Sequence, residues 1–257
     1  PTPLQSAQMP LLDLEEPPPP IPPTPLEPDR LDLGMAESND QLAHKENNVQ
    51  PFAVREFGIM LSSSEPDSYG YTFADSAEVD GPDYDLEDIS ASGTPVVLGD
   101  DEMSSAIPLD FTFNYYGYDY TSLYICSNGF LTFLSGQVCS WQTAGAQIPD
   151  SANPNGIIAG WWEDLDPSVG GAIYYETLGT APNRRFVVYV QDVQHYPNGN
   201  PVTLQYKLFE GTNIIEVHYQ ATPSDGGTHS AGIENQSGAK GLQYYRGIEG
   251  LVTPLAV

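Results

Sequence analysis

The sequence has little positive charge and no segment with the 3.6-residue periodicity of a helix. It contains 8 Lys and Arg against 35 Asp and Glu, for a formal net charge of −27 at pH 7. No Lys or Arg occurs between Arg55 and Arg184. Such a surface repels phosphate, so nucleic acid and anionic membranes are poor partners. No apolar run is long enough to span a membrane, and we expect no membrane insertion.

Common catalytic motifs are also missing. The sequence has no HExxH helix, no CxxC pair and no Gly-x-Ser-x-Gly elbow. His195, His218 and His229 are scattered over expected turns and strands. Carboxylate pairs of the glycosidase kind mean little where acidic residues are so abundant. We therefore expect no enzyme, and a free-standing hydrolase is the least favoured interpretation.

Cysteine is scarce, but its placement is informative. Cys126 and Cys139 are the two cysteines, and they enclose a short loop. A disulfide between them would contribute about 3 kcal/mol through loop closure and would require an oxidising compartment. Two buried free thiols are the alternative. The disulfide interpretation predicts an extracellular or cell-surface protein.

Turn-forming residues and tyrosine are plentiful, as expected for short strands joined by turns. The sequence has 24 Gly, 24 Pro and 16 Tyr. The clearest hairpin spans residues 120–133, where Leu123 and Ile125 alternate with other side chains before Asn128-Gly129. Asn-Gly predicts a type I′ turn, with positive φ at both residues. Further strands are expected at residues 54–61, 69–73, 95–98, 108–113, 156–162, 171–177, 185–192, 202–210, 214–219, 228–234, 242–245 and 251–257. This spacing predicts an all-β fold, an antiparallel β-sandwich that is jelly-roll-like.

Residues 1–50 differ in composition from this expected domain of residues 51–257. Prolines dominate residues 17–25, which predicts an extended, acidic, proline-rich N-terminal arm of about 3.1 Å per residue. Its most apolar side chains are Met9, Leu11, Leu12 and Leu14. We expect these four residues to contact either the arm's own domain or a neighbouring copy. The chain begins with Pro rather than Met, which indicates a removed leader or a fragment.

An ordered set of motifs resembles a known module. The motifs lie at residues 107–113, 115–117, 127–133, 155–159, 162–166, 183–188, 208–211 and 232–235. Their succession resembles a β-sandwich module of bacterial secreted and cell-surface proteins, and it is distantly similar to the nidogen-like extracellular domain. The resemblance covers roughly residues 68–257. It implies a non-catalytic extracellular module used for attachment or assembly.

Three kinds of candidate site follow from the residues. Asp164 and Asp166 lie two apart, so a strand would place both carboxylates on one face, which suits Ca²⁺. A solvated strand end is the alternative. Asn235 begins a glycosylation sequon within an expected turn. Trp141, Trp161 and Trp162 are expected in the core, with stacking on sugars as the alternative.

Together these features predict a structural or adhesive subunit of an extracellular, fibre-like assembly. Self-association into a homopolymer would use the N-terminal arm as the connector between neighbours. The alternative is a non-catalytic accessory module of a larger secreted enzyme, which would bind surface glycans or another surface.

Overall fold

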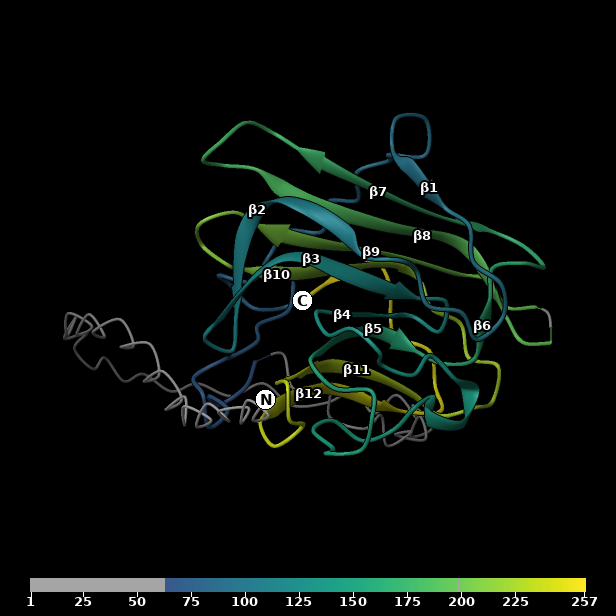
Figure 1. The fold of residues 1–257 in the computed structure, drawn as a ribbon. Coiled ribbons are helices and arrows are strands. Elements are labelled where there is room, and N and C mark those ends of the chain that lie inside the picture. The colour runs from purple at the N-terminus through teal and green to yellow at the C-terminus, as the bar shows by residue number, and fades with distance from the viewer. Residues whose placement is uncertain (1–62, 198) are drawn as a thin grey trace, which may run out of the picture. The chain divides into compact units, whose positions relative to one another are not determined.

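A computed structural model describes residues 63–197 and 199–257 and contains two antiparallel β-sheets (Figure 1). The first sheet has the order β1 (Thr94–Val96), β7 (Ala172–Leu178), β8 (Arg185–His195), β9 (Val202–Phe209), β10 (Ile215–Ala221) and β13 (Leu255–Ala256), and β6 (Leu165–Asp166) also pairs with β8. The second has the order β12 (Gly241–Gly247), β11 (His229–Glu234), β5 (Ile157–Trp162), β4 (Phe130–Thr132), β3 (Tyr118–Cys126) and β2 (Ile107–Tyr115). A short 3₁₀ helix, η1, spans Trp141–Thr143. The predicted β-sandwich is confirmed.

The main core lies between the two sheets. Strand β2 alternates between buried and outward residues, as a strand with one face on the core must. In contrast, all six residues of β5 are buried. A second apolar cluster explains this, because Cys139 and Ile148 pack over the outer side of β5 against Ile157 and Trp162. The chain that crosses the outer face therefore buries both faces of β5.

Buried tyrosine hydroxyl groups join the sheets through backbone atoms. Tyr206 of β9 accepts a hydrogen bond from Gly160 N at 3.0 Å and donates one to Gly129 O at 2.7 Å. Tyr219 of β10 donates to Gly160 O at 3.0 Å. A Cβ at Gly160 would lie 2.6 Å from the Tyr206 hydroxyl, so only glycine permits this approach. Buried hydroxyl groups need partners, and β5 supplies them.

The predicted hairpin around Asn128-Gly129 is confirmed, but the predicted turn type is wrong. Cys126 pairs with Phe130, so the loop contains three residues rather than two. Gly129 has a φ of +76°, whereas Asn128 is not among the residues with positive φ. Gly129 N donates to Cys126 O at 3.3 Å. This is a type I turn followed by a left-handed glycine, a common three-residue hairpin.

Two predicted strands differ from the structure. Residues 69–73 form no strand, because the Asp67 carboxylate accepts hydrogen bonds from the backbone N of Tyr69, Gly70 and Tyr71 and curls the chain into a turn. Only the bridge between Ser63 and Ala74 pairs this region. The strand expected over 251–257 shortens to β13. The strand expected at 54–61 and the domain boundary near residue 50 lie outside the described residues.

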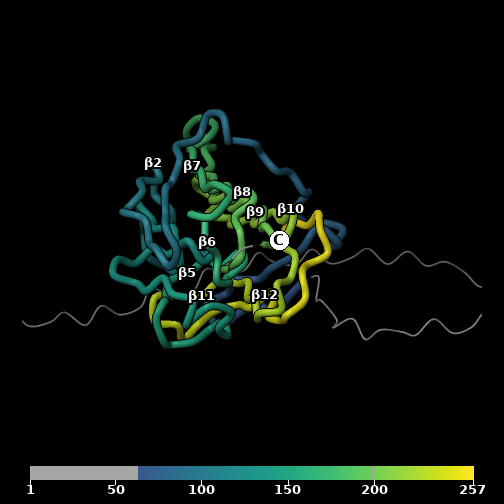
Figure 2. Tube along the Cα trace, turned by 90° about the vertical axis from the view of Figure 1, so that its right-hand side faces the viewer, coloured from purple at the N-terminus to yellow at the C-terminus, as the bar shows by residue number. Residues whose placement is uncertain are grey.

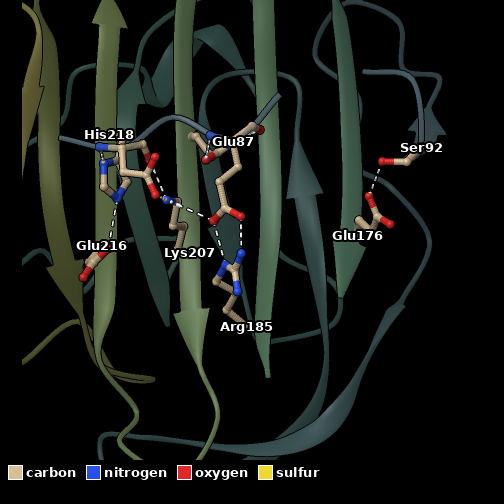
Figure 3. Close-up of polar contacts among 9 residues, drawn as sticks. Glu87, Ser92, Glu176, Arg185, Lys207, Glu216 and His218 are labelled. Carbon is tan, nitrogen blue, oxygen red and sulfur yellow. Dashed lines mark hydrogen bonds and ion pairs between the residues drawn. The ribbon is translucent and has the colours of Figure 1, made fainter. Parts of the chain in front are cut away.

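A segment before β1 crosses the outer face of the first sheet (Figure 3). We call residues 84–92 the strap. Gln205 pairs with the Glu87 backbone, since its Oε1 accepts from Glu87 N at 3.0 Å and its Nε2 donates to Glu87 O at 2.6 Å. The Glu87 carboxylate binds Arg185 through two hydrogen bonds and lies 3.1 Å from Nζ of buried Lys207. The Arg185 hydrogen bonds hold the pKa of Glu87 below its usual value. Ionic contacts thus fasten the strap to β8 and β9.

We predict that Tyr206→Phe lowers the free energy of unfolding by about 1–2 kcal/mol, because two buried backbone groups lose a partner. Chemical denaturation would measure the change. Tyr118→Phe, at a position 42% exposed, is the control and should stay within about 0.5 kcal/mol of wild type. Equal effects of the two substitutions would contradict the assigned role of the Tyr206 hydroxyl.

We predict that Glu87→Gln lowers the free energy of unfolding by about 3 kcal/mol, since it leaves the buried Lys207 ammonium with only the more distant, solvent-exposed carboxylate of Asp85 at 3.5 Å. The matched control is Glu176→Gln, which alters a single contact with Ser92 at the surface. Denaturant unfolding at pH 7 compares the two. A loss below about 1 kcal/mol for Glu87→Gln would show that the strap is held by other contacts.

Candidate functional site

An apolar groove of about 430 Å³ opens between the two sheets. We call it the inter-sheet groove. Val217 comes from β10, whereas Ile233 and Leu242 come from β11 and β12. Phe73 and Tyr244 also line it, with their rings edge to face at 5.1 Å. The volume is within the range of about 300–1,000 Å³ found for binding pockets, and the lining suits apolar side chains.

Both ends of the described chain reach this groove. Near the N-terminal end, Ser63 bridges to Ala74, and Ala74 lines the groove. At the other end, Val257 lines the groove and exchanges backbone hydrogen bonds with Val217 of 2.9 and 3.0 Å. Figure 2 shows the C-terminus beside β10. The first described residue is therefore paired with a residue that lines an apolar surface.

One wall of the inter-sheet groove is a sheet edge. Strand β12 is the last strand of the second sheet within the described residues, and its Leu242 and Tyr244 line the groove. An edge strand offers unpaired backbone groups to an added strand. A segment laid along β12 would point alternate side chains to one face, so apolar residues two apart could enter the groove together.

The predicted disulfide is present. Cys126 and Cys139 are bonded, with a Cα–Cα distance of 5.6 Å. Cys126 ends β3 and Cys139 lies in the segment that covers β5. The bond attaches this covering segment to the hairpin, and its burial places it in the second apolar cluster. The bond therefore has a structural role, which is to hold the covering segment in place over β5.

The two aspartates expected to share one strand face, Asp164 and Asp166, have different surroundings. Asp164 precedes β6, and one of its carboxylate oxygens lies within 4.8 Å of those of Asp100 and Asp101. Burial, followed by repulsion from Asp100, raises the pKa of Asp164 to about 6. Asp166 is buried and accepts hydrogen bonds from the backbone N and Oγ of Ser168 at 2.9 and 2.6 Å. Calcium binding at Asp164 and Asp166 stays a prediction.

The sequon asparagine lies in a closed turn. Asn235 is 4% exposed, and its Oδ1 accepts hydrogen bonds from Ala239 N and Lys240 N at 3.0 and 3.1 Å. Ser237 of the sequon also donates to this oxygen at 3.3 Å. These contacts hold the turn after β11 and do not favour a glycan on the folded chain. Glycosylation of Asn235 stays a prediction.

The neighbouring Glu234 is a buried acid with a strongly altered pKa. Its side chain is 1% exposed and accepts a hydrogen bond from Asp150 N at 2.9 Å. Burial raises the pKa of Glu234 to about 8. Between pH 4.5 and 8 the unfolded chain loses this proton while the folded chain keeps it. Stability from this group is therefore complete below about pH 4.5 and declines as the pH rises to 8.

We predict that Glu234→Gln removes this pH dependence, because Gln stays neutral and keeps the acceptor for Asp150 N. Between pH 5 and pH 8.5, wild type should lose on the order of 3 kcal/mol more unfolding free energy than the variant does. Urea denaturation at both values measures the difference, with exposed Glu249→Gln as the control. Parallel curves for wild type and Glu234→Gln would show that folding does not raise the pKa of Glu234.

Histidine and tryptophan positions depart from the sequence expectation. His195 and His229 are not scattered, since their rings meet at 5.7 Å between the sheets, whereas His218 lies under the strap. Trp161 and Trp162 are buried as predicted, but Trp141 is 58% exposed beside Asp101, which accepts from its backbone N at 2.6 Å. The contacts across the sheets have no local sequence signal.

The arm residues Met9, Leu11, Leu12 and Leu14 lie outside the described residues.

Comparison with known proteins identifies one family. The model of a protein family described as NIDO related matches residues 70–249. No solved structure matches the chain. In the part of the chain that the structure describes, no helix has the length and apolar character needed to cross a membrane.

Proposed function

Because this chain belongs to the NIDO-related family, we propose that it is a non-catalytic structural or adhesive subunit of an extracellular assembly. The Cys126–Cys139 disulfide supports an oxidising, extracellular location. In this proposal, copies of the chain associate into a fibre, and the arm of residues 1–50 connects one copy to the next.

The observation that carries the proposal is the inter-sheet groove beside the start of the described chain. The arm is expected to be extended, and residues 17–28 alone would reach roughly 35 Å. That length is comparable with the width of a domain, so the arm of one copy can reach the groove of another. Leu12 and Leu14 are two residues apart and would enter the groove together if the segment were added along β12.

The symmetry of such a contact determines the form of the assembly. The arm and the groove are different surfaces, so the contact is heterologous, head to tail. Repetition gives a filament unless the rotation between copies closes a ring. The competing arrangement places each arm in the groove of its own domain, where it would stabilise a monomer.

We predict that replacing Leu11, Leu12 and Leu14 together with Asp abolishes assembly, because the groove is apolar and the added charges would lose hydration there. The matched control replaces Leu31 and Leu33 with Asp in the same arm and should assemble like wild type. Sedimentation velocity and electron microscopy of the full chain measure assembly.

A chain without residues 1–50 should sediment as a folded monomer. The connector proposal is wrong if this shortened chain forms the same fibres, or if the full chain is a monomer at every concentration. A monomeric full chain whose melting temperature falls in the triple Asp variant would indicate an arm folded onto its own domain.

An accessory glycan-binding role is the second candidate, and exposed Trp141 favours it. An indole ring that is 58% exposed offers an apolar face for a sugar, and the neighbouring carboxylates of Asp100, Asp101 and Asp164 could accept hydrogen bonds from hydroxyl groups. Glycan binding by a chain that stays monomeric, lost in Trp141→Ala, would support this candidate over the fibre subunit.

A further inference from the structure

Four ionisable side chains from distant segments meet at one end of the sandwich. Glu163 follows β5, His195 ends β8, Asp225 lies in the loop before β11, and His229 begins β11. One possible ligand atom from each of His195, Asp225 and His229 lies within 4.8 Å of the other two. His195 is 2% exposed and His229 is 0% exposed. None of the contacts described for the inter-sheet groove involves this group.

The hydrogen bonds around His195 assign different roles to its two ring nitrogens. Its Nδ1 lies 2.6 Å from the carbonyl oxygen of Asn200. A carbonyl oxygen only accepts, so the proton is assigned to Nδ1 and the lone pair to Nε2. A neutral ring in this tautomer presents the lone pair that a metal ion requires. Trp161 Nε1 donates a long hydrogen bond of 3.4 Å to Nε2, which a metal ion bound at this nitrogen would displace.

His229 also has an oxygen atom close to its Nδ1, here from a carboxylate. Its Nδ1 lies 2.8 Å from Glu163 Oε2, and its Nε2 lies 3.9 Å from Asp225 Oδ1. Histidine ligands of metal ions characteristically donate their other N–H to a carboxylate or a backbone carbonyl. Glu163 and Asn200 supply one of each. The ring of His229 also stacks on Trp161 at 4.3 Å, which fixes its plane.

These buried atoms are incompletely satisfied within the protein. Across residues 63–197 and 199–257, no atom forms a hydrogen bond with either ring nitrogen of His229 or with Glu163 Oε2. The 2.8 Å separation is short enough for a bond, but the atoms are not aligned. Each unsatisfied buried polar group costs about 1–3 kcal/mol. A ligand on Nε2 of His229 would satisfy one atom and orient the ring toward Glu163.

The loop before β11 brings Asp225 toward the histidines. Asp225 Oδ1 accepts a hydrogen bond from Gly227 N at 2.7 Å, which turns the carboxylate back over the loop. A Cβ at Gly227 would lie 2.8 Å from Glu163 Oε1, so a larger residue there would force the Glu163 carboxylate to move. Asp225 is itself exposed, so it lies between the buried histidines and solvent.

We propose that Nε2 of His195, Nε2 of His229 and Oδ1 of Asp225 bind a divalent transition-metal ion of the Zn²⁺ type, with Glu163 and the Asn200 carbonyl as outer partners. Imidazole nitrogen suits Zn²⁺, whereas Ca²⁺ takes oxygen ligands. Two ligand atoms about 2.0–2.1 Å from a tetrahedral Zn²⁺ lie roughly 3.4 Å apart. The 3.9 Å separation of His229 Nε2 and Asp225 Oδ1 thus requires a small closure of the loop.

An ion at this position would stabilise the sandwich. His195 belongs to the first sheet and His229 to the second, so the ion would join the sheets directly. Three protein ligands leave a fourth position for water on the side of exposed Asp225. The inference depends on neither the arm nor the proposed assembly. The competing account is a stacked cluster of Trp161 and the two histidines with no metal ion.

The test uses the full chain, freed of metal with a chelator and titrated with ZnCl₂. Calorimetry should give one strong site per chain. The melting temperature should rise by about 5–10 °C when free Zn²⁺ is 100 times the dissociation constant. CaCl₂ at the same concentration should cause a much smaller rise.

Variants separate this site from adventitious binding. Asp225→Asn changes an exposed loop residue and should fold, yet it should weaken Zn²⁺ binding at least tenfold, as should His229→Gln. Glu163→Gln should weaken binding about 10–100-fold through the outer partner. His44→Gln and His218→Gln are the controls and should retain the zinc-dependent melting shift. The proposal is overturned if Zn²⁺ gives neither heat nor a melting shift, or if Asp225→Asn and His229→Gln bind like wild type.

Discussion

The close approach of the two sheets at Gly160 is the constraint on which the rest of the sandwich depends. The hydroxyl of Tyr206 satisfies backbone atoms of the opposite sheet, and the absence of a side chain at Gly160 makes room for it. The adjacent Trp161 is fully buried and stacks on His229, so its position depends on the same stretch of β5. A substitution at Gly160 would therefore disturb the inter-sheet core and the histidine cluster together.

Two segments outside the sheets bury apolar residues on the outer faces of the strands. The disulfide-bonded segment buries the outer side of β5, and the strap buries Val187 and Tyr189 beneath Ile89. The two are held by different means, a covalent bond in one case and buried ionic contacts in the other. Arg185 of β8 and Lys207 of β9 both contact the Glu87 carboxylate, so together they define where the strap lies.

The sequence predicted those features that local patterns determine. Alternation and turn residues identified the sandwich, most strands and the hairpin at Asn128-Gly129. The short separation of Cys126 and Cys139 identified the disulfide. The turn type was missed because the number of loop residues depends on strand register, which the Asn-Gly pair does not define. Asp164 was identified as a candidate ligand, but its neighbours Asp100 and Asp101 come from a loop some sixty residues earlier.

Contacts between the two sheets could not be predicted from the sequence, because they join residues that lie far apart in the chain. No local pattern pairs His195 with His229, because they occupy different sheets. Lys207 reads as an ordinary polar residue of a strand, yet it is buried by a strap that lies 120 residues earlier in the chain. Such contacts depend on the complete topology, and a single sequence does not reveal it.

The use of the cations inside the fold has a consequence for the surface charge of this protein. Arg184, Arg185 and Lys207 are each bound to carboxylates of the same chain, so few positive groups are left to offset a formal net charge of −27. The molecule behaves as a polyanion with its own cloud of counter-ions. At physiological ionic strength this cloud screens repulsion beyond about 8 Å. In the assembly that we propose, a connector that extends several times farther would make its first contact where the two bodies do not yet repel each other. Dilute salt solutions would then be the least favourable medium for assembly.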